Sequence, residues 1–286
     1  MRLGIFAKTF EGNSPDQVLP AAATAGYAAV QYNMACSGLP SLPDNIPTEV
    51  VQDIAVAAAK SQITIAALSG TYNMIHPDAS IRANGHERLA NLARAAAGMK
   101  TNLITLCTGT RDPDDQWRDH PENRSVAAWK DLLASMEVAI GIADKHDIFL
   151  GIEPELSNVV HSARTARQLL DEIKSPHLKI VLDPANLFET ASLEEQRRLV
   201  AEAVDLLADS IVMGHAKDRT PSGGFTAAGC GVLDYPHYLA CLKSARFDGA
   251  MVTHGLSAKD AGRVASFLTA QMEQAGFKVE TACLQQ

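Results

Sequence analysis

Acidic and imidazole side chains end four apolar runs in the second half of the chain. These are Glu153 and Glu155 in "FLGIEPE", Asp183 in "LKIVLD", His215 in "IVMGHAKD" and His254 after "GAMVT". A strand-end Asp before Pro is often a turn former, and a lone His is more often a hydrogen-bonded core residue. Neither explanation covers four runs that end alike, and crowded carboxylates without a cation would repel one another. Because carboxylates and imidazoles together are a normal donor set for a divalent metal ion, we predict a metal site at these run ends.

The same runs belong to a regular alternation of apolar and helical segments along the whole chain. Between the runs lie Ala-rich charged segments with helix-period apolar positions, several of which open with Ser or Pro. Eight units of about 36 residues match the size of a βαβ repeat. The sequence therefore predicts an α/β fold, a single (β/α)8 TIM barrel, with strands within residues 3–8, 28–33, 63–70, 103–109, 149–155, 178–183, 211–218 and 249–256. A doubly wound open sheet is the competing fold, but no GxGxxG motif follows the first run.

Charge and composition restrict the partners and the compartment. The 286 residues carry a formal net charge of −8, which is the wrong sign for binding nucleic acid. No signal peptide is recognisable, and no apolar run approaches the roughly 18 residues of a membrane span. Five widely spaced cysteines without a CxxC pair suit a reducing compartment. We expect one cytoplasmic domain over residues 1–286, with a surface tail at 278–286, a small-molecule partner and no membrane partner; a homo-oligomer stays open.

The strand ends also resemble a known family. In order and spacing, the chain is similar to the sugar phosphate isomerase/epimerase family with the xylose isomerase-like barrel, through the motifs "GIEPELSN", "VLDPANL", "MGHAKDR", "GCGVLDYPHY" and "FDGAMVTHG". The resemblance implies one divalent metal ion bound by Glu153, Asp183, His215 and the residue at position 254. That position usually holds a glutamate in the family, and here it is His254. A second departure is Asn186, where the family often has a histidine that touches the substrate.

The resemblance implies a reaction class, and His254 changes it. Sugar isomerases and epimerases remove a proton beside a carbonyl and give an enediolate whose charge a metal ion neutralises. Epimerases of the family use two glutamates on opposite faces of the sugar. With His254 at one of those positions, the chain suits one-base chemistry on a small sugar, sugar acid or sugar phosphate. The expected catalytic residues are Glu153, Glu155 as a reserve base, and Lys217. Decarboxylation or another lyase reaction of a keto-sugar acid is the alternative.

Several loop residues are candidates for holding the substrate. Arg111, Asn186, His76 and Arg219 are predicted to bind it, and Lys217 and Arg219 at the barrel mouth favour an anionic substrate. A solvated Arg111 and a local ion pair between Lys217 and Asp218 are the simpler readings of the same residues. Trp117 and His120 are expected in loop walls, and Gly229 and Gly231 in a turn rather than a phosphate loop. Whether the sugar carries a phosphate stays open.

Two other functions fit the same barrel. Abasic-site endonucleases need several zinc ions, more ligands than the sequence offers, and a basic surface. A sugar-binding barrel that has lost its activity with the second glutamate is the other alternative. If the metal site forms, two imidazoles favour manganese, zinc or another transition metal over magnesium.

Overall fold

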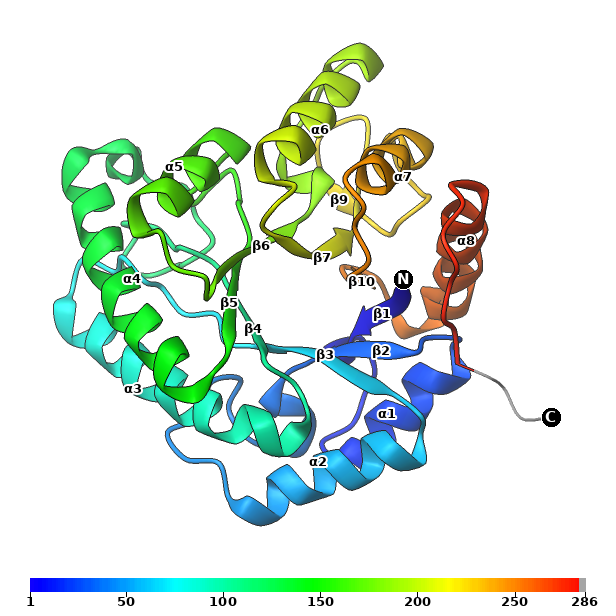
Figure 1. Cartoon of the computed structure of the whole chain (residues 1–286), viewed down its shortest axis with the longest axis horizontal. Helices are drawn as coiled ribbons and strands as arrows, with labels where there is room; N and C mark the ends of the chain where they lie inside the picture. Colours follow the sequence, from blue (N-terminus) through cyan, green and yellow to red (C-terminus); the bar gives the residue numbers. More distant parts are fainter. Residues whose placement is uncertain (283–286) are drawn as a thin grey trace.

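Eight parallel strands form a closed barrel in the computed structural model, which describes residues 1–282 (Figure 1). Around the barrel the strand order is β1-β10-β7-β6-β5-β4-β3-β2, so the first and last strands of the barrel pair and leave no open edge. The strands are β1 (Arg2–Phe6), β2 (Ala29–Tyr32), β3 (Thr64–Ser69), β4 (Leu103–Leu106), β5 (Phe149–Ile152), β6 (Leu178–Leu182), β7 (Ile211–Ala216) and β10 (Ala250–Thr253). The predicted TIM barrel is confirmed, and each strand lies inside its predicted run or within one residue of it.

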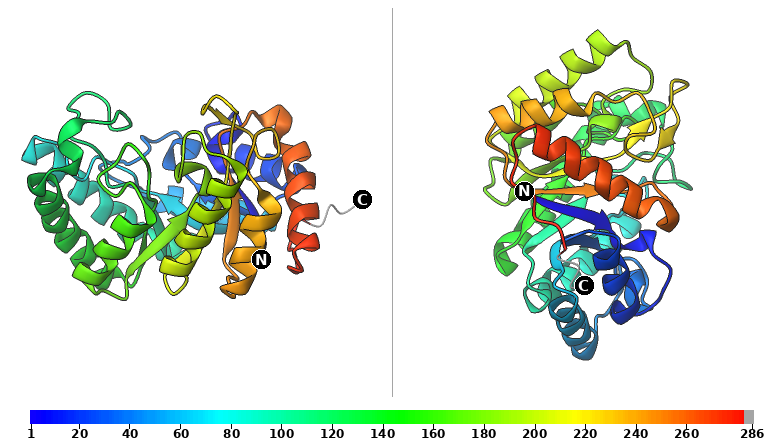
Figure 2. Two further views of the ribbon diagram at one scale, coloured as in Figure 1. Left: turned by 90° about the horizontal axis from the view of Figure 1, so that it is seen from above. Right: turned by 90° about the vertical axis from the view of Figure 1, so that its right-hand side faces the viewer.

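The helices surround the barrel and cover the outer face of the strands (Figures 1 and 2). Serine caps set where several of them begin: Ser125, Ser162 and Ser192 each accept a hydrogen bond from a backbone N–H in the first turn. The long helices are α1 (Pro15–Thr24), α2 (Thr48–Lys60), α3 (Ala79–Ala96), α4 (Val126–His146), α5 (Ala163–Ile173), α6 (Leu193–Leu207), α7 (Tyr235–Ser244) and α8 (Ala261–Gln274). Short 3-10 turns are η1 (Ala7–Thr9), η2 (Met34–Ser37), η3 (Ala97–Met99), η4 (Pro121–Arg124), η5 (Pro184–Asn186) and η6 (Ala258–Asp260).

A small apolar cluster supports the site from below. Its buried members come from five strands: Ala67, Leu103, Val181, Met213 and Val252. Side chains two residues apart on a strand share a face. The positions two residues after Val181, Met213 and Val252 are those of Asp183, His215 and His254. Three of the predicted ligands therefore lie on the inward face of their strands, one step beyond the apolar cluster.

One small element was not predicted from the sequence. Directly after β7, β8 (Asp218–Arg219) pairs antiparallel with β9 (Phe225–Thr226) and forms a hairpin. Near the other end of the chain, Glu280 bridges to Arg2, the first residue of β1, so this part of the predicted tail is anchored. Residues 283–286, including Cys283, lie outside the described residues. Among the helices of residues 1–282, none is long and apolar enough to cross a membrane.

Candidate metal centre

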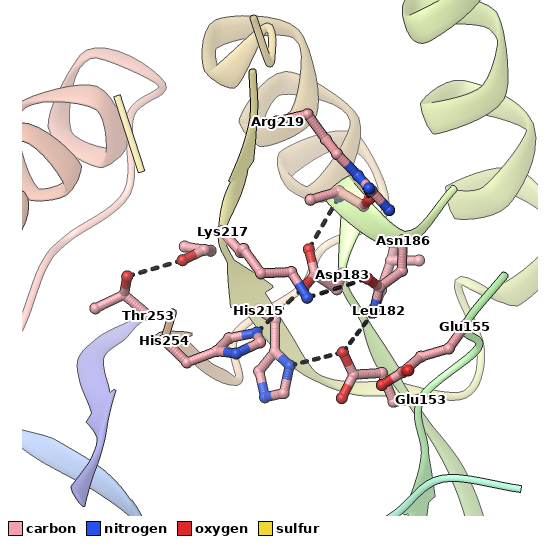
Figure 3. A network of polar contacts seen from close by, with 12 residues as sticks. Glu153, Glu155, Leu182, Asp183, Asn186, His215, Lys217, Arg219, Thr253 and His254 are labelled. Carbon is pink, nitrogen blue, oxygen red and sulfur yellow. Dashed lines mark hydrogen bonds and ion pairs between the residues drawn. The ribbon is translucent and has the colours of Figure 1, made fainter. Parts of the chain in front are cut away.

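Four side chains from four strand ends converge at the carboxyl end of the barrel (Figure 3). Glu153 follows β5, Asp183 follows β6, His215 lies in β7 and His254 follows β10. Each offers one ligand atom, and these four atoms all lie within 4.8 Å of one another. Two carboxylates and two imidazoles at this separation form a cluster that could hold a metal ion.

The tautomer of His215 leaves one ring nitrogen available for a cation. Its Nε2 donates a hydrogen bond of 2.8 Å to Oε1 of Gln31, whose Nε2 donates in turn to Oγ1 of Thr105 at 3.0 Å. The other nitrogen, Nδ1, is buried and has no hydrogen-bond partner among the described residues. It lies 3.1 Å from Oε1 of Glu153, without hydrogen-bond geometry. Glu153 raises the pKa of His215 despite its burial, so a proton fits between the two facing atoms in the metal-free site and a metal ion could take its place.

His254 and Asp183 form the other half of the cluster. Nε2 of His254 lies 3.1 Å from Oδ2 of Asp183, and its ring centroid is 4.6 Å from that of His215. Oδ1 of Asp183 accepts from the backbone N–H of Ala185 at 2.9 Å, which orients the carboxylate. Burial and the neighbouring His215 lower the pKa of His254, so the neutral, electron-donating imidazole is favoured.

Lys217 and Asn186 connect the two carboxylates. The ammonium of Lys217 lies 3.2 Å from Oδ2 of Asp183 and donates to Oδ1 of Asn186 at 3.1 Å. The amide of Asn186 donates to Oε1 of Glu153 at 2.8 Å. Burial alone would lower the pKa of Lys217, but Asp183 and Glu153 outweigh it and raise the pKa. Lys217 is therefore a charged group in the site itself.

Asp218 does not form the local ion pair with Lys217 that the sequence left open. Its carboxylate accepts hydrogen bonds from the backbone N–H groups of Arg219, Gly229, Gly231 and Leu233. A Cβ at Gly231 would lie 2.1 Å from the carbonyl oxygen of Arg219, so the loop can approach the hairpin this closely only with glycine. Asp218 thus fixes the loop after β9, and Lys217 is free to face the site.

A comparison of the whole sequence with known families identifies the family of this chain. The family described as "xylose isomerase-like TIM barrel" matches residues 19–270, which is most of the chain. The chain belongs to this family. No curated protein matches the sequence. The solved structures compared below are 14–16% identical to the chain, and at this identity their likeness shows the shared fold.

Three solved structures illustrate the fold of the family. The E. coli 3-keto-D-glucoside 4-epimerase is 14% identical, with a TM-score of 0.75 over 94% of this chain and 99% of that one. A D-allulose 3-epimerase from Methylomonas sp., solved in complex with D-allulose, is 16% identical, with a TM-score of 0.74 over 96% and 97%. The IOLI protein, solved with a binding zinc atom, is 16% identical, with a TM-score of 0.74 over 97% and 100%.

A cavity of about 1030 Å³ opens above the cluster, as expected for this family's barrel. The predicted residues that line it are Glu153, Glu155, Asn186, His215, Lys217, Arg219 and His254, with Trp117 at its wall. The thiol of Cys107 donates to Oε1 of half-buried Glu155 at 3.3 Å. Burial and the neighbouring Glu153 raise the pKa of Glu155 to about 7.

Two predicted substrate-binding residues lie elsewhere. The guanidinium of Arg111 pairs with Asp131 of α4 at 2.7 Å and does not line the cavity. His76 donates from Nε2 to the carbonyl of Pro113 and accepts at Nδ1 from the backbone N–H of Asp78, so both ring nitrogens are used in fixing a loop. His120 accepts from a backbone N–H at the start of η4 and is also absent from the lining. Arg111 and His76 therefore lie outside the cavity lining, and their role in substrate binding stays a prediction; His120 was predicted only as a loop-wall residue.

Gln31 and Phe225 are among the residues of the site that sequence reasoning missed. Gln31 holds His215, and its signal was visible: it is a polar residue inside the apolar run "AAVQY". Phe225 lines the cavity from β9, a strand of two residues that is too short to show a periodic pattern. Gln31 contacts a partner, His215, that is far from it in sequence, and Phe225 lies in an irregular loop region.

Proposed function

We propose that this protein is a metal-dependent isomerase that acts on a small sugar or sugar derivative through an enediolate-type intermediate. The observation that carries the proposal is the convergence of four metal-ligand side chains beneath an open cavity. The names of its structural neighbours, two sugar epimerases and a zinc-binding protein, are consistent with it. Fold likeness alone does not assign the reaction, so the argument depends on the site.

Glu153, Asp183, His215 and His254 would hold the cation. A bound divalent ion supplies stabilisation of the negative charge that develops on a substrate oxygen during proton abstraction. With two imidazoles in the set, manganese, zinc or another transition metal is favoured over magnesium. Gln31 would keep the Nδ1 lone pair of His215 directed at the ion.

The proton-transfer groups are arranged asymmetrically. Glu153 offers a carboxylate on one side of the cluster, and Glu155 lies beside it in the cavity wall. At the other side stands His254, whose lone pair is used as a ligand and cannot accept a proton at the same time. Lys217 can donate a hydrogen bond to a substrate oxygen. One base and one donor suit transfer of a proton between neighbouring carbons, which is isomerisation, or the cleavage of a keto-sugar acid, better than inversion of one centre.

The test is metal loading followed by solvent exchange. Protein loaded with manganese or zinc is incubated in deuterated buffer with a panel of ketoses, sugar acids and their phosphates, and each is examined by NMR. We expect deuterium at the carbon beside the carbonyl of at least one compound, together with its aldose–ketose partner, and no exchange with Glu153→Gln. Carbon dioxide release without exchange would indicate the lyase instead. Metal binding without exchange or cleavage of any compound would leave only a binding protein.

A further inference from the structure

Arg219 is a buried arginine without an acidic partner. Only 6% of the residue is exposed, and it lines the cavity above the metal cluster. Among residues 1–282, no carboxylate oxygen lies within 4.0 Å of its guanidinium. Buried charges in proteins are normally paired or bind a ligand, because removing a charge from water is costly. We therefore expect an anion from outside the chain to bind this guanidinium.

The backbone holds the side chain of Arg219 in place and uses only part of it. Nε donates to the carbonyl of Ala185 at 2.7 Å, and Nη1 donates to the carbonyl of Gly223 in the hairpin loop. Within the described part of the chain, Nη2 has no hydrogen-bond acceptor. A guanidinium fixed at two nitrogens, with the third available, is prepared to bind a carboxylate or phosphate oxygen.

Lys217 adds a second positive charge on the same wall. The ring of Phe225 contacts both cations: its centroid lies 3.9 Å from Nζ of Lys217 and 3.8 Å from Cζ of Arg219. The ring belongs to β9, which places it over the cavity side of the hairpin. It keeps water from one side of each cation, and a lower local dielectric strengthens the attraction of both for an anion.

A divalent ion in the cluster would leave Lys217 and Arg219 without a cluster carboxylate to balance them. The carboxylates of Glu153 and Asp183 then balance the ion, and the charges of Lys217 and Arg219 remain. Three further acids line the cavity: Asp119, Glu155 and Glu189. Asp119 pairs with Arg124 at 2.7 Å, whereas Glu155 and Glu189 lie farther than 4.0 Å from every lysine and arginine nitrogen of the described residues and form no ion pair with Lys217 or Arg219.

We propose that the substrate carries a carboxylate or phosphate group, which binds Nη2 of Arg219 with support from Lys217. The inference rests on the proposed sugar-derivative function and narrows it to sugar acids and sugar phosphates, to the exclusion of neutral sugars. The anionic group lies against the β8–β9 hairpin, and the sugar carbons extend from it toward Glu153 and His254.

Binding, measured without turnover, tests the inference. Titration calorimetry on zinc-loaded protein compares three probes with one carbon chain: sorbitol, gluconate and sorbitol 6-phosphate. We expect gluconate or sorbitol 6-phosphate to bind at least tenfold more tightly than sorbitol, a difference of about 1.4 kcal/mol. The tighter of the two identifies the anionic group. Equal affinity for the three probes, or no binding of either anion, overturns the proposal.

Variants separate Arg219 from the metal, because gluconate can also bind a metal ion. Arg219→Gln should remove the preference for the anion and leave zinc content unchanged, and Arg219→Lys should retain part of it. Arg263→Gln removes one exposed arginine outside the cavity and should change nothing. A preference that survives in a folded Arg219→Gln protein assigns it to the metal and overturns the proposal. Solvent exchange confined to neutral sugars would overturn this inference and support the proposed isomerase. A preference for the anionic probes without solvent exchange would support this inference and overturn the proposed isomerase.

Discussion

Nε2 of His254 lies 3.1 Å from Oδ2 of Asp183, although β7 separates the strands that carry them. The contact therefore joins two strand ends that are not neighbours in the barrel, past the end of β7. A hydrogen-bonded core histidine would also make such a contact, and so would a ligand that shares an ion with Asp183. The two roles predict opposite results when the imidazole is replaced by a carboxylate.

We expect His254→Glu to retain the metal. A glutamate ligand can bind the same ion, and it adds a second base, so epimerase activity should appear where the wild type has none. Metal analysis and thermal melting with and without zinc measure this. If the histidine only packs, the new carboxylate lies against Asp183 without a cation, and the fold loses several kcal/mol. Unchanged metal stoichiometry in His254→Ala would also contradict the ligand assignment.

Lys217→Met should destabilise the metal-free protein by about 3–5 kcal/mol, because it leaves the buried carboxylate of Asp183 without its cation. Zinc should restore most of this stability by neutralising the same carboxylate. Urea unfolding of both forms, with and without zinc, provides the measurement. Lys259→Met, at an exposed lysine of η6, is the matched control. Equal loss of stability in the two metal states would contradict a carboxylate shared between Lys217 and the ion.

The strand ends could be predicted because their pattern is local. Because every second side chain of a strand lies on the same face, His254 faces inward as Val252 does. The regular order of the apolar runs places Glu153, Asp183 and His215 at the same end of the barrel. The path of a loop depends on contacts with residues far from it in sequence. Arg111 lies in a loop that directs its side chain to Asp131 on α4, and nothing in the residues around it indicates this partner.

The hydrogen bonds around His215 also depend on contacts that the sequence pattern does not predict. Gln31 reaches it only because the barrel closes, which brings residues 184 positions apart into hydrogen-bond contact. The pairing of Lys217 with Asp183 rather than the adjacent Asp218 depends on four backbone N–H groups that the loop after β9 directs at Asp218. Composition and spacing identify the charged groups, and the loops decide how they pair.

Removing the metal should lower the stability of the wild type. A ligand present at 100 times its dissociation constant stabilises the folded state by about 2.7 kcal/mol, and the relief of repulsion in the cluster is part of that binding energy. Melting curves in chelator, manganese, zinc and magnesium measure the effect. We expect manganese or zinc to raise the melting temperature more than magnesium. Stabilisation by magnesium alone would contradict a site with two imidazole ligands.

Gln31→Leu should weaken metal binding by about 10–100-fold, because His215 then loses the acceptor that holds its proton on Nε2. With that proton free to move to Nδ1, the nitrogen that faces Glu153 is no longer always available as a ligand. Competition with a chromophoric chelator gives the zinc affinity of each variant. Gln168→Leu, which removes an exposed side chain on α5, is the control and should bind zinc as the wild type does. Because Gln31→Glu also offers an acceptor to Nε2, it should retain zinc better than the leucine variant. Equal zinc affinity in Gln31→Leu and the wild type would show that Nδ1 of His215 is not held as a ligand by this hydrogen bond.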